Sequence, residues 1–174
     1  SIKRLISASP ALPLKFNELI EGNALSRHND NSYIEMKVYE KGDRVVRQTK
    51  EYYIHKTGKS KTCLFSGVLN ILEDTYGFTS RIGCFDDRID KEVDKYSNGM
   101  FFELSDNILY IVIRNGCAKN GGTQYEERIP QSDFSCDTLN GKGPSNKSII
   151  LFNKFLLFSI DFSWFGNGIV RFSI

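Results

Sequence analysis

The chain has 174 residues, of which 40% are hydrophobic and 25% are charged, a composition ordinary for a folded globular protein. Its 23 basic and 21 acidic side chains give a net charge of +2, so charge provides no case for a nucleic-acid or anionic-membrane partner. No apolar run reaches about 18 residues, and we therefore expect no membrane insertion.

Aromatic residues and turn dipeptides both favour strands over helices. The chain contains 13 Phe and 8 Tyr, residue types that are enriched on pleated, half-buried surfaces. Asn-Gly, the preferred pair of the type I′ hairpin turn, occurs five times. The sequence therefore predicts an all-β protein with many tight turns.

The first 32 residues have no regular apolar pattern. Pro10 and Pro13 interrupt the apolar stretch, residues 26–32 (SRHNDNS) read as a polar connector, and residues 14–21 are compatible with a short helix. We expect residues 1–32 to form an irregular N-terminal arm or lead-in.

Strand patterns begin at residue 33. In 156–165, apolar residues alternate with Ser and Asp, and no helical period of 3.6 follows residue 148. We expect strands at 33–39, 44–55, 62–72, 79–85, 99–104, 108–114, 156–165 and 169–174. The expected core comprises Ile34, Met36, Val38, Leu64, Leu69, Ile71, Ile82, Phe102, Leu104, Tyr110, Val112, Phe158, Ile160, Phe162, Trp164, Val170 and Phe172. Residues 33–174 are thus predicted to form one antiparallel β-sandwich, of jelly-roll or lectin-like type.

The segment 141–148 (GKGPSNKS) resembles a phosphate-binding loop but lacks its context. Asn146 stands where that motif has its second glycine, and strands follow where the motif needs a helix N-terminus. Asn146-Lys147-Ser148 is also an N-glycosylation pattern, although three residues recur often by chance. We interpret the segment as a surface turn.

No motif predicts an enzyme. Neither His28 nor His55 stands in a nucleophile pattern. Glu103 and Asp161 each interrupt an apolar strand, which only weakly indicates a carboxylate pair, and we favour the interpretation that each faces outward from the sheet. We expect no catalytic residue and no cofactor.

The acidic loop that follows residue 85 is the best metal candidate. Carboxylate oxygens are the ligands that Ca²⁺ prefers, but EF-hand spacing is absent and basic residues are interleaved, so a solvated loop is favoured over an ion site. The weak calcium candidates are Asp86, Asp87, Asp90 and Asp94. The four cysteines contain no C-x-x-C pair, and free thiols are favoured over two disulfides.

The order of motifs after residue 79 resembles a β-rich domain of virion structural proteins of tailed phages and large DNA viruses. Those domains read R-x-G-x-F-D-D, then N-G-x-F-F-E, then a Q-S-D turn, and close with a hairpin. Here 81–87 (RIGCFDD), 98–103 (NGMFFE), 131–134 (QSDF) and 160–171 (IDFSWFGNGIVR) match in turn. The resemblance covers about 79–174 and departs from the family by a lengthened acidic loop.

This resemblance implies a non-enzymatic viral structural protein, a capsid, spike or tail component located in the virion. Its expected partners are other virion proteins and copies of itself. The alternative is a carbohydrate-binding, lectin-like module with exposed aromatic rings as stacking platforms. The weak stacking candidates are Tyr52, Tyr53, Tyr76 and Tyr96. Aromatics buried on alternating faces favour the first function, and a coplanar exposed set favours the second.

Overall fold

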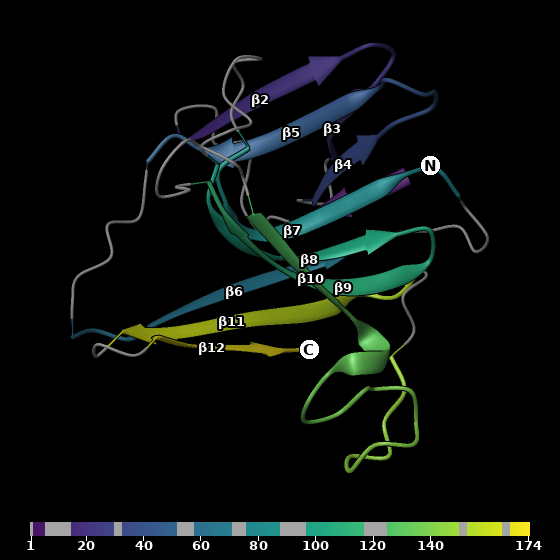
Figure 1. Ribbon diagram of the computed structural model, residues 1–174. Helices are drawn as coiled ribbons and strands as arrows, with labels where there is room; N and C mark the ends of the chain where they lie inside the picture. Colours follow the sequence, from purple (N-terminus) through teal and green to yellow (C-terminus); the bar gives the residue numbers. More distant parts are fainter. Residues whose placement is uncertain are drawn as a thin grey trace. The chain divides into compact units, whose positions relative to one another are not determined.

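The computed structural model describes residues 2–5, 15–29, 33–51, 58–70, 76–87, 97–116, 125–149, 153–164 and 168–174. These residues form an all-β structure with antiparallel sheets and one short 3-10 helix (Figure 1). No helix within them is long and apolar enough to cross a membrane. The elements are β1 (Ile2–Leu5), β2 (Phe16–Glu21), β3 (Leu25–Asn29), β4 (Tyr33–Lys37), β5 (Arg44–Thr49), β6 (Lys61–Val68), β7 (Thr79–Phe85), β8 (Gly99–Ser105), β9 (Ile108–Asn115), β10 (Tyr125–Pro130), η2 (Gln131–Asp133), β11 (Leu156–Trp164) and β12 (Gly168–Ser173).

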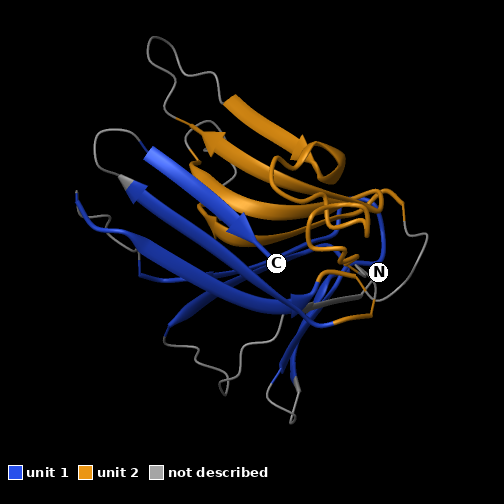
Figure 2. Cartoon of the chain, turned by 90° about the horizontal axis from the view of Figure 1, so that it is seen from below, with its two compact units in different colours: residues 1–68, 155–174 blue, residues 69–154 orange. Residues whose placement is uncertain are grey.

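The chain divides into two compact units, coloured separately in Figure 2. Unit 1 comprises 1–68 and 155–174, and unit 2 comprises 69–154. The sequence predicts a single domain from residue 33 onward. The observed division differs because strands from both ends of the chain pair in the same sheet of unit 1.

Unit 1 contains a six-stranded antiparallel sheet in the order β12-β11-β6-β1-β4-β3 and a separate pair, β2-β5. The predicted alternation of β11 is confirmed, since Phe158 and Ile160 are fully buried. Leu64, expected in the core, is instead 64% exposed. It lies opposite Ser159, so it shares the Ser159 face of the sheet, whereas Phe65 lies opposite Phe158. A strand that is apolar on both faces does not indicate which face is buried.

The predicted irregular arm over 1–32 is wrong for the described part of that segment. It contains β1, β2 and β3, and residues 16–21 form a strand rather than part of a helix. β1 pairs with β4 and β6, and β2 pairs with β5. The partners of β1 and β2 are distant in the chain, so a local pattern could not indicate these two strands. β3 instead pairs with the adjacent β4, although residues 26–29 read as a polar connector.

Unit 2 is built on a four-stranded antiparallel meander, β7-β8-β9-β10. The predicted hairpin of β8 and β9 is confirmed. Its turn residues Asp106 and Asn107 both have positive φ, 48° and 65°, as a type I′ turn requires. In β8, four consecutive residues (101–104) are buried, so side chains on both faces of this strand are buried.

Candidate functional site

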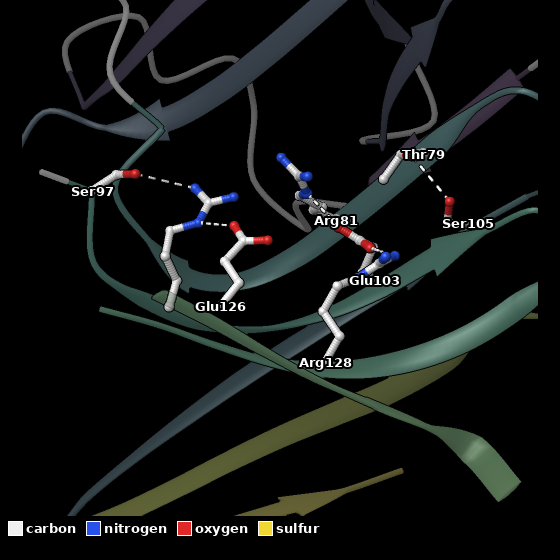
Figure 3. Close-up of polar contacts among 8 residues, drawn as sticks. Thr79, Arg81, Ser97, Glu103, Ser105, Glu126 and Arg128 are labelled. Atoms are coloured by element: carbon white, nitrogen blue, oxygen red, sulfur yellow. Dashed lines mark hydrogen bonds and ion pairs between the residues drawn. The ribbon is translucent and has the colours of Figure 1, made fainter. Parts of the chain in front are cut away.

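One face of the unit 2 sheet carries most of its charged groups. Directly paired residues share a face, and the register places Arg81 opposite Glu103 and Glu103 opposite Tyr110. On β10, Arg128 lies opposite Val112 and therefore on the same face. We call this side the charged face; Figure 3 shows its polar contacts, with Arg81 and Arg128 at Glu103 and a second group at Ser97 and Glu126. The opposite face is apolar, with Ile82, Phe102 and Ile111 in one row.

Glu103 is the centre of the charged face. Its side chain is 3% exposed, and Arg81 Nε donates a hydrogen bond to Oε2 at 2.7 Å. Arg128 Nη2 donates to the other oxygen, Oε1 (Figure 3). A buried carboxylate needs such charge-assisted partners, because an unpaired one would be strongly destabilising. The Arg81 and Arg128 side chains remain 33% and 42% exposed.

Aromatic rings form the floor under the guanidinium groups. The Arg128 guanidinium carbon lies 4.3 Å from the centre of the Tyr110 ring, over which the side chain crosses from β10 to reach Glu103. The Arg81 guanidinium lies 5.5 Å from the Phe101 ring centre. These distances are those of cation–π contacts, which hold a guanidinium plane in place.

Arg114 completes the charged face at the end where β8 begins. It is 7% exposed, and its Nε donates to Glu126 Oε1 at 2.5 Å, while Nη1 donates to Ser97 Oγ at 3.3 Å. Its guanidinium lies 5.1 Å from the Phe101 ring centre. On the charged face, Arg114 thus pairs with Glu126, while Arg81 and Arg128 share Glu103.

Two glycines let the first two sequence motifs, 81–87 and 98–103, pack against each other. A Cβ at Gly83 would lie 2.6 Å from the Cα and Cβ of Phe101, and one at Gly99 would lie 2.3 Å from the Cβ of Phe85. Each glycine therefore accommodates a phenylalanine of the neighbouring strand, and the rings of Phe85 and Phe101 lie 4.8 Å apart. Together with the ion pair to Glu103, these contacts account for Arg81, Gly83 and Phe85 of the first motif.

The loop 131–149 is held by its own side chains. Asp137 accepts the N–H groups of Leu139 at 2.7 Å and Ser145 at 2.8 Å. The Ser145 hydroxyl, followed by these two N–H groups, lowers the pKa of the Asp137 carboxyl. Glycine at position 143 leaves room for the Asp137 carboxylate, since a Cβ there would lie 2.1 Å from Asp137 Oδ1.

The segment 141–148 is a surface turn, as the sequence predicts. The Gly141 N–H donates to the Lys147 carbonyl at 2.9 Å, and the Asn146 N–H donates to the Gly143 carbonyl at 3.0 Å. Asn140 and Ser148 close the turn as an isolated antiparallel bridge. The next described element is strand β11, so the described residues offer no helix N-terminus to a phosphate at this turn.

Most of the predicted site residues lie outside the described part of the chain. Asp86 and Asp87 follow β7, while Asp90 and Asp94 lie outside the described residues. Within the described part of the chain, no group of three or more His, Cys, Asp or Glu could hold a metal ion. Cys63 and Cys136 are free thiols, and Cys117 is not among the described residues.

The other candidates divide in the same way. Tyr76 is 70% exposed, while Tyr52, Tyr53 and Tyr96 lie outside the described residues, as does His55. His28 is a β3 residue opposite Ile34.

Of the two strand carboxylates, only Glu103 belongs to a charged cluster. Asp161 instead accepts a hydrogen bond from Thr62 Oγ1 at 2.5 Å. The outward-facing explanation is wrong for Glu103, which is buried. The sequence did not indicate its arginine partners, although Glu126 and Arg128 at alternate positions of one strand are a signal that could have located them.

No family model, curated protein or solved structure matches the chain.

Proposed function

We propose that the chain is a non-enzymatic viral structural protein, a capsid, spike or tail component that acts through protein–protein assembly in the virion. The proposal includes the jelly-roll or lectin-like sandwich that the strand patterns predict. One observation carries it: the residues that resemble virion proteins support one another. Arg81 pairs with Glu103, Phe101 packs over Gly83, and the Asp86 N–H donates to the Asn98 carbonyl at 2.9 Å. Motifs that hold a scaffold together suit a structural role.

Exposed apolar side chains on unit 1 support an assembly role. Leu64 is 64% exposed and Leu157 is 58% exposed. Because Leu64 lies opposite Ser159 and Leu157 opposite Ser66, the two leucines are diagonal neighbours on one face of β6 and β11. Adjacent exposed aliphatics on a sheet are a contact surface of the kind that a neighbouring subunit covers.

The edge of the same sheet also supports assembly. Among the described residues, β12 pairs only with β11, and the strand GIVRFS carries one charge and no proline. Soluble monomers usually protect such an edge with charges, proline or a covering segment. In an assembly, a strand of another subunit can provide that cover.

The test is co-purification of the chain with virus particles. Particles from the source culture are banded on a density gradient, and the peptides of each fraction are quantified by mass spectrometry. We expect the chain to band with the particles at a fixed ratio to the other shell proteins. Its absence from every particle fraction would overturn the proposal, and glycan binding with and without calcium would then be measured.

A further inference from the structure

The guanidinium groups of Arg81 and Arg128 have hydrogen-bond donors beyond those that Glu103 uses. Each guanidinium has five N–H donors in a planar fork. Arg81 binds Glu103 through Nε, and Arg128 binds it through Nη2. Within the described part of the chain, Arg81 Nη1 and Nη2 and Arg128 Nε and Nη1 have no hydrogen-bond or ion-pair partner.

These remaining donors are both accessible and held in place. The two arginine side chains are 33% and 42% exposed, whereas the carboxylate that they share is 3% exposed. Tyr110 supports the Arg128 guanidinium and Phe101 supports that of Arg81. Fixing the arginines before binding lowers the entropy that a ligand must offset, so the geometry favours recognition of a planar, bidentate group.

The charge of the fork selects the class of ligand. Two guanidinium groups on one carboxylate leave a single positive charge among these three side chains. A singly charged carboxylate would neutralise that excess, whereas a polyanion would meet too little positive charge. Arginine forks also match the geometry of a carboxylate through two parallel hydrogen bonds.

We propose that Arg81 and Arg128 form a carboxylate-binding fork that receives an Asp or Glu side chain of a neighbouring virion protein. The identity of the partner rests on the proposed function. Arginine and tyrosine are enriched among the residues that dominate binding at protein interfaces, and here Arg128 lies directly on Tyr110. Glu103 is a positioning residue, because its carboxylate accepts a hydrogen bond from each guanidinium group and so orients both.

Binding is tested by NMR on the isolated chain labelled with ¹⁵N at arginine. The probe is a Gly-Glu-Gly peptide blocked at both ends, so that its only carboxylate is the side chain. We expect saturable shifts of the Arg81 and Arg128 Nε–H signals at constant ionic strength. The Arg27 signal should not move; this arginine is 60% exposed and pairs with Glu35 at 3.5 Å, without a second arginine. The matched Gly-Gln-Gly peptide should cause no saturable shift.

Variants separate binding from folding. Arg128→Gln should weaken the peptide about tenfold or more, because a charged hydrogen-bonding partner is lost. Arg81→Lys retains the charge but lacks the planar guanidinium group that can donate two parallel hydrogen bonds, and it should weaken binding by about the same factor. Arg27→Gln should bind like wild type. Circular dichroism and the amide spectrum confirm that each variant is folded.

Three outcomes would overturn the carboxylate-binding fork itself. They are the absence of a saturable shift, an equal response to the Gln peptide, and tighter binding of inorganic phosphate than of the Glu peptide. Tighter binding of N-acetylneuraminic acid would assign the fork to a glycan carboxylate and overturn the protein partner. Banding of wild-type particles on a density gradient tests the proposed function independently of peptide binding. Particles that contain the chain, combined with no peptide binding, would refute only the fork.

Discussion

Replacing Glu103 by glutamine tests whether the charged face stabilises unit 2. Gln keeps the size of the side chain but removes the charge between Arg81 and Arg128, and it offers one acceptor oxygen in place of two. A hydrogen bond to a charged group contributes about 1.5–3 kcal/mol, and two are affected. Because both arginines are partly exposed and can be resolvated, we expect a discounted loss of about 2–3 kcal/mol in the free energy of unfolding.

The assay is urea unfolding followed by circular dichroism, with hydrogen exchange of the β8 amides to locate the loss. With an m-value of about 2–3 kcal/mol per M, the midpoint should fall by roughly 1 M. The control is Glu21→Gln, since Glu21 and Arg44 are 29% and 33% exposed and 3.7 Å apart. Such a pair contributes about 1 kcal/mol at most. Equal midpoints for the two variants would refute the reasoning that Glu103 is a buried, shared counter-ion.

Three further predictions concern the core, a close strand contact and an acidic turn. Ile160→Asp should abolish the cooperative thermal transition, since an unpaired charge would be buried, whereas Leu157→Asp on the exposed face of the same strand should keep it. Gly83→Ala should lower the free energy of unfolding by about 1–3 kcal/mol in urea titrations, because its Cβ would lie 2.6 Å from main-chain atoms of β8; wild-type stability would contradict this contact. The pKa of the Asp137 carboxyl is lowered, chiefly by the hydrogen bond from the Ser145 hydroxyl. The ionised carboxyl therefore stabilises the fold above the ordinary pKa of 3.8, and this contribution is lost as the pH falls through the lower pKa of the folded state. In hydrogen exchange, the amides of the loop should therefore lose protection at acid pH in the wild type, and Asp137→Asn should lose less on the same change of pH. An equal loss in both proteins would exclude the Asp137 carboxyl as the cause.

Local patterns predicted β7, β8 and β9 of the unit 2 sheet but not β10. The span 79–85 coincides with β7, and 108–114 differs from β9 by one residue at its end. Alternation and turn chemistry are properties of neighbouring residues, so a short stretch of sequence contains all the information needed. The same patterns could not predict β1 or β2, whose partners are distant in the chain.

Register is the property that the sequence patterns left open. The predicted core placed Phe102 and Tyr110 together, but in the structure Phe102 lies opposite Ile111, and Tyr110 lies opposite Glu103 on the other face. The facing of β8 was ambiguous because residues on both of its faces are buried. A shift of one residue exchanges the two faces, and only pairing with neighbouring strands fixes it.

The sequence by itself determined an all-β chain, the alternation of β11 and the surface turn at 141–148, because period and turn preference are written in adjacent residues. Only the tertiary structure brought together Arg81, Glu103 and Arg128, which come from three different strands. Burial of the carboxylate makes its two arginine partners necessary, and the register of the meander sets which arginines reach it.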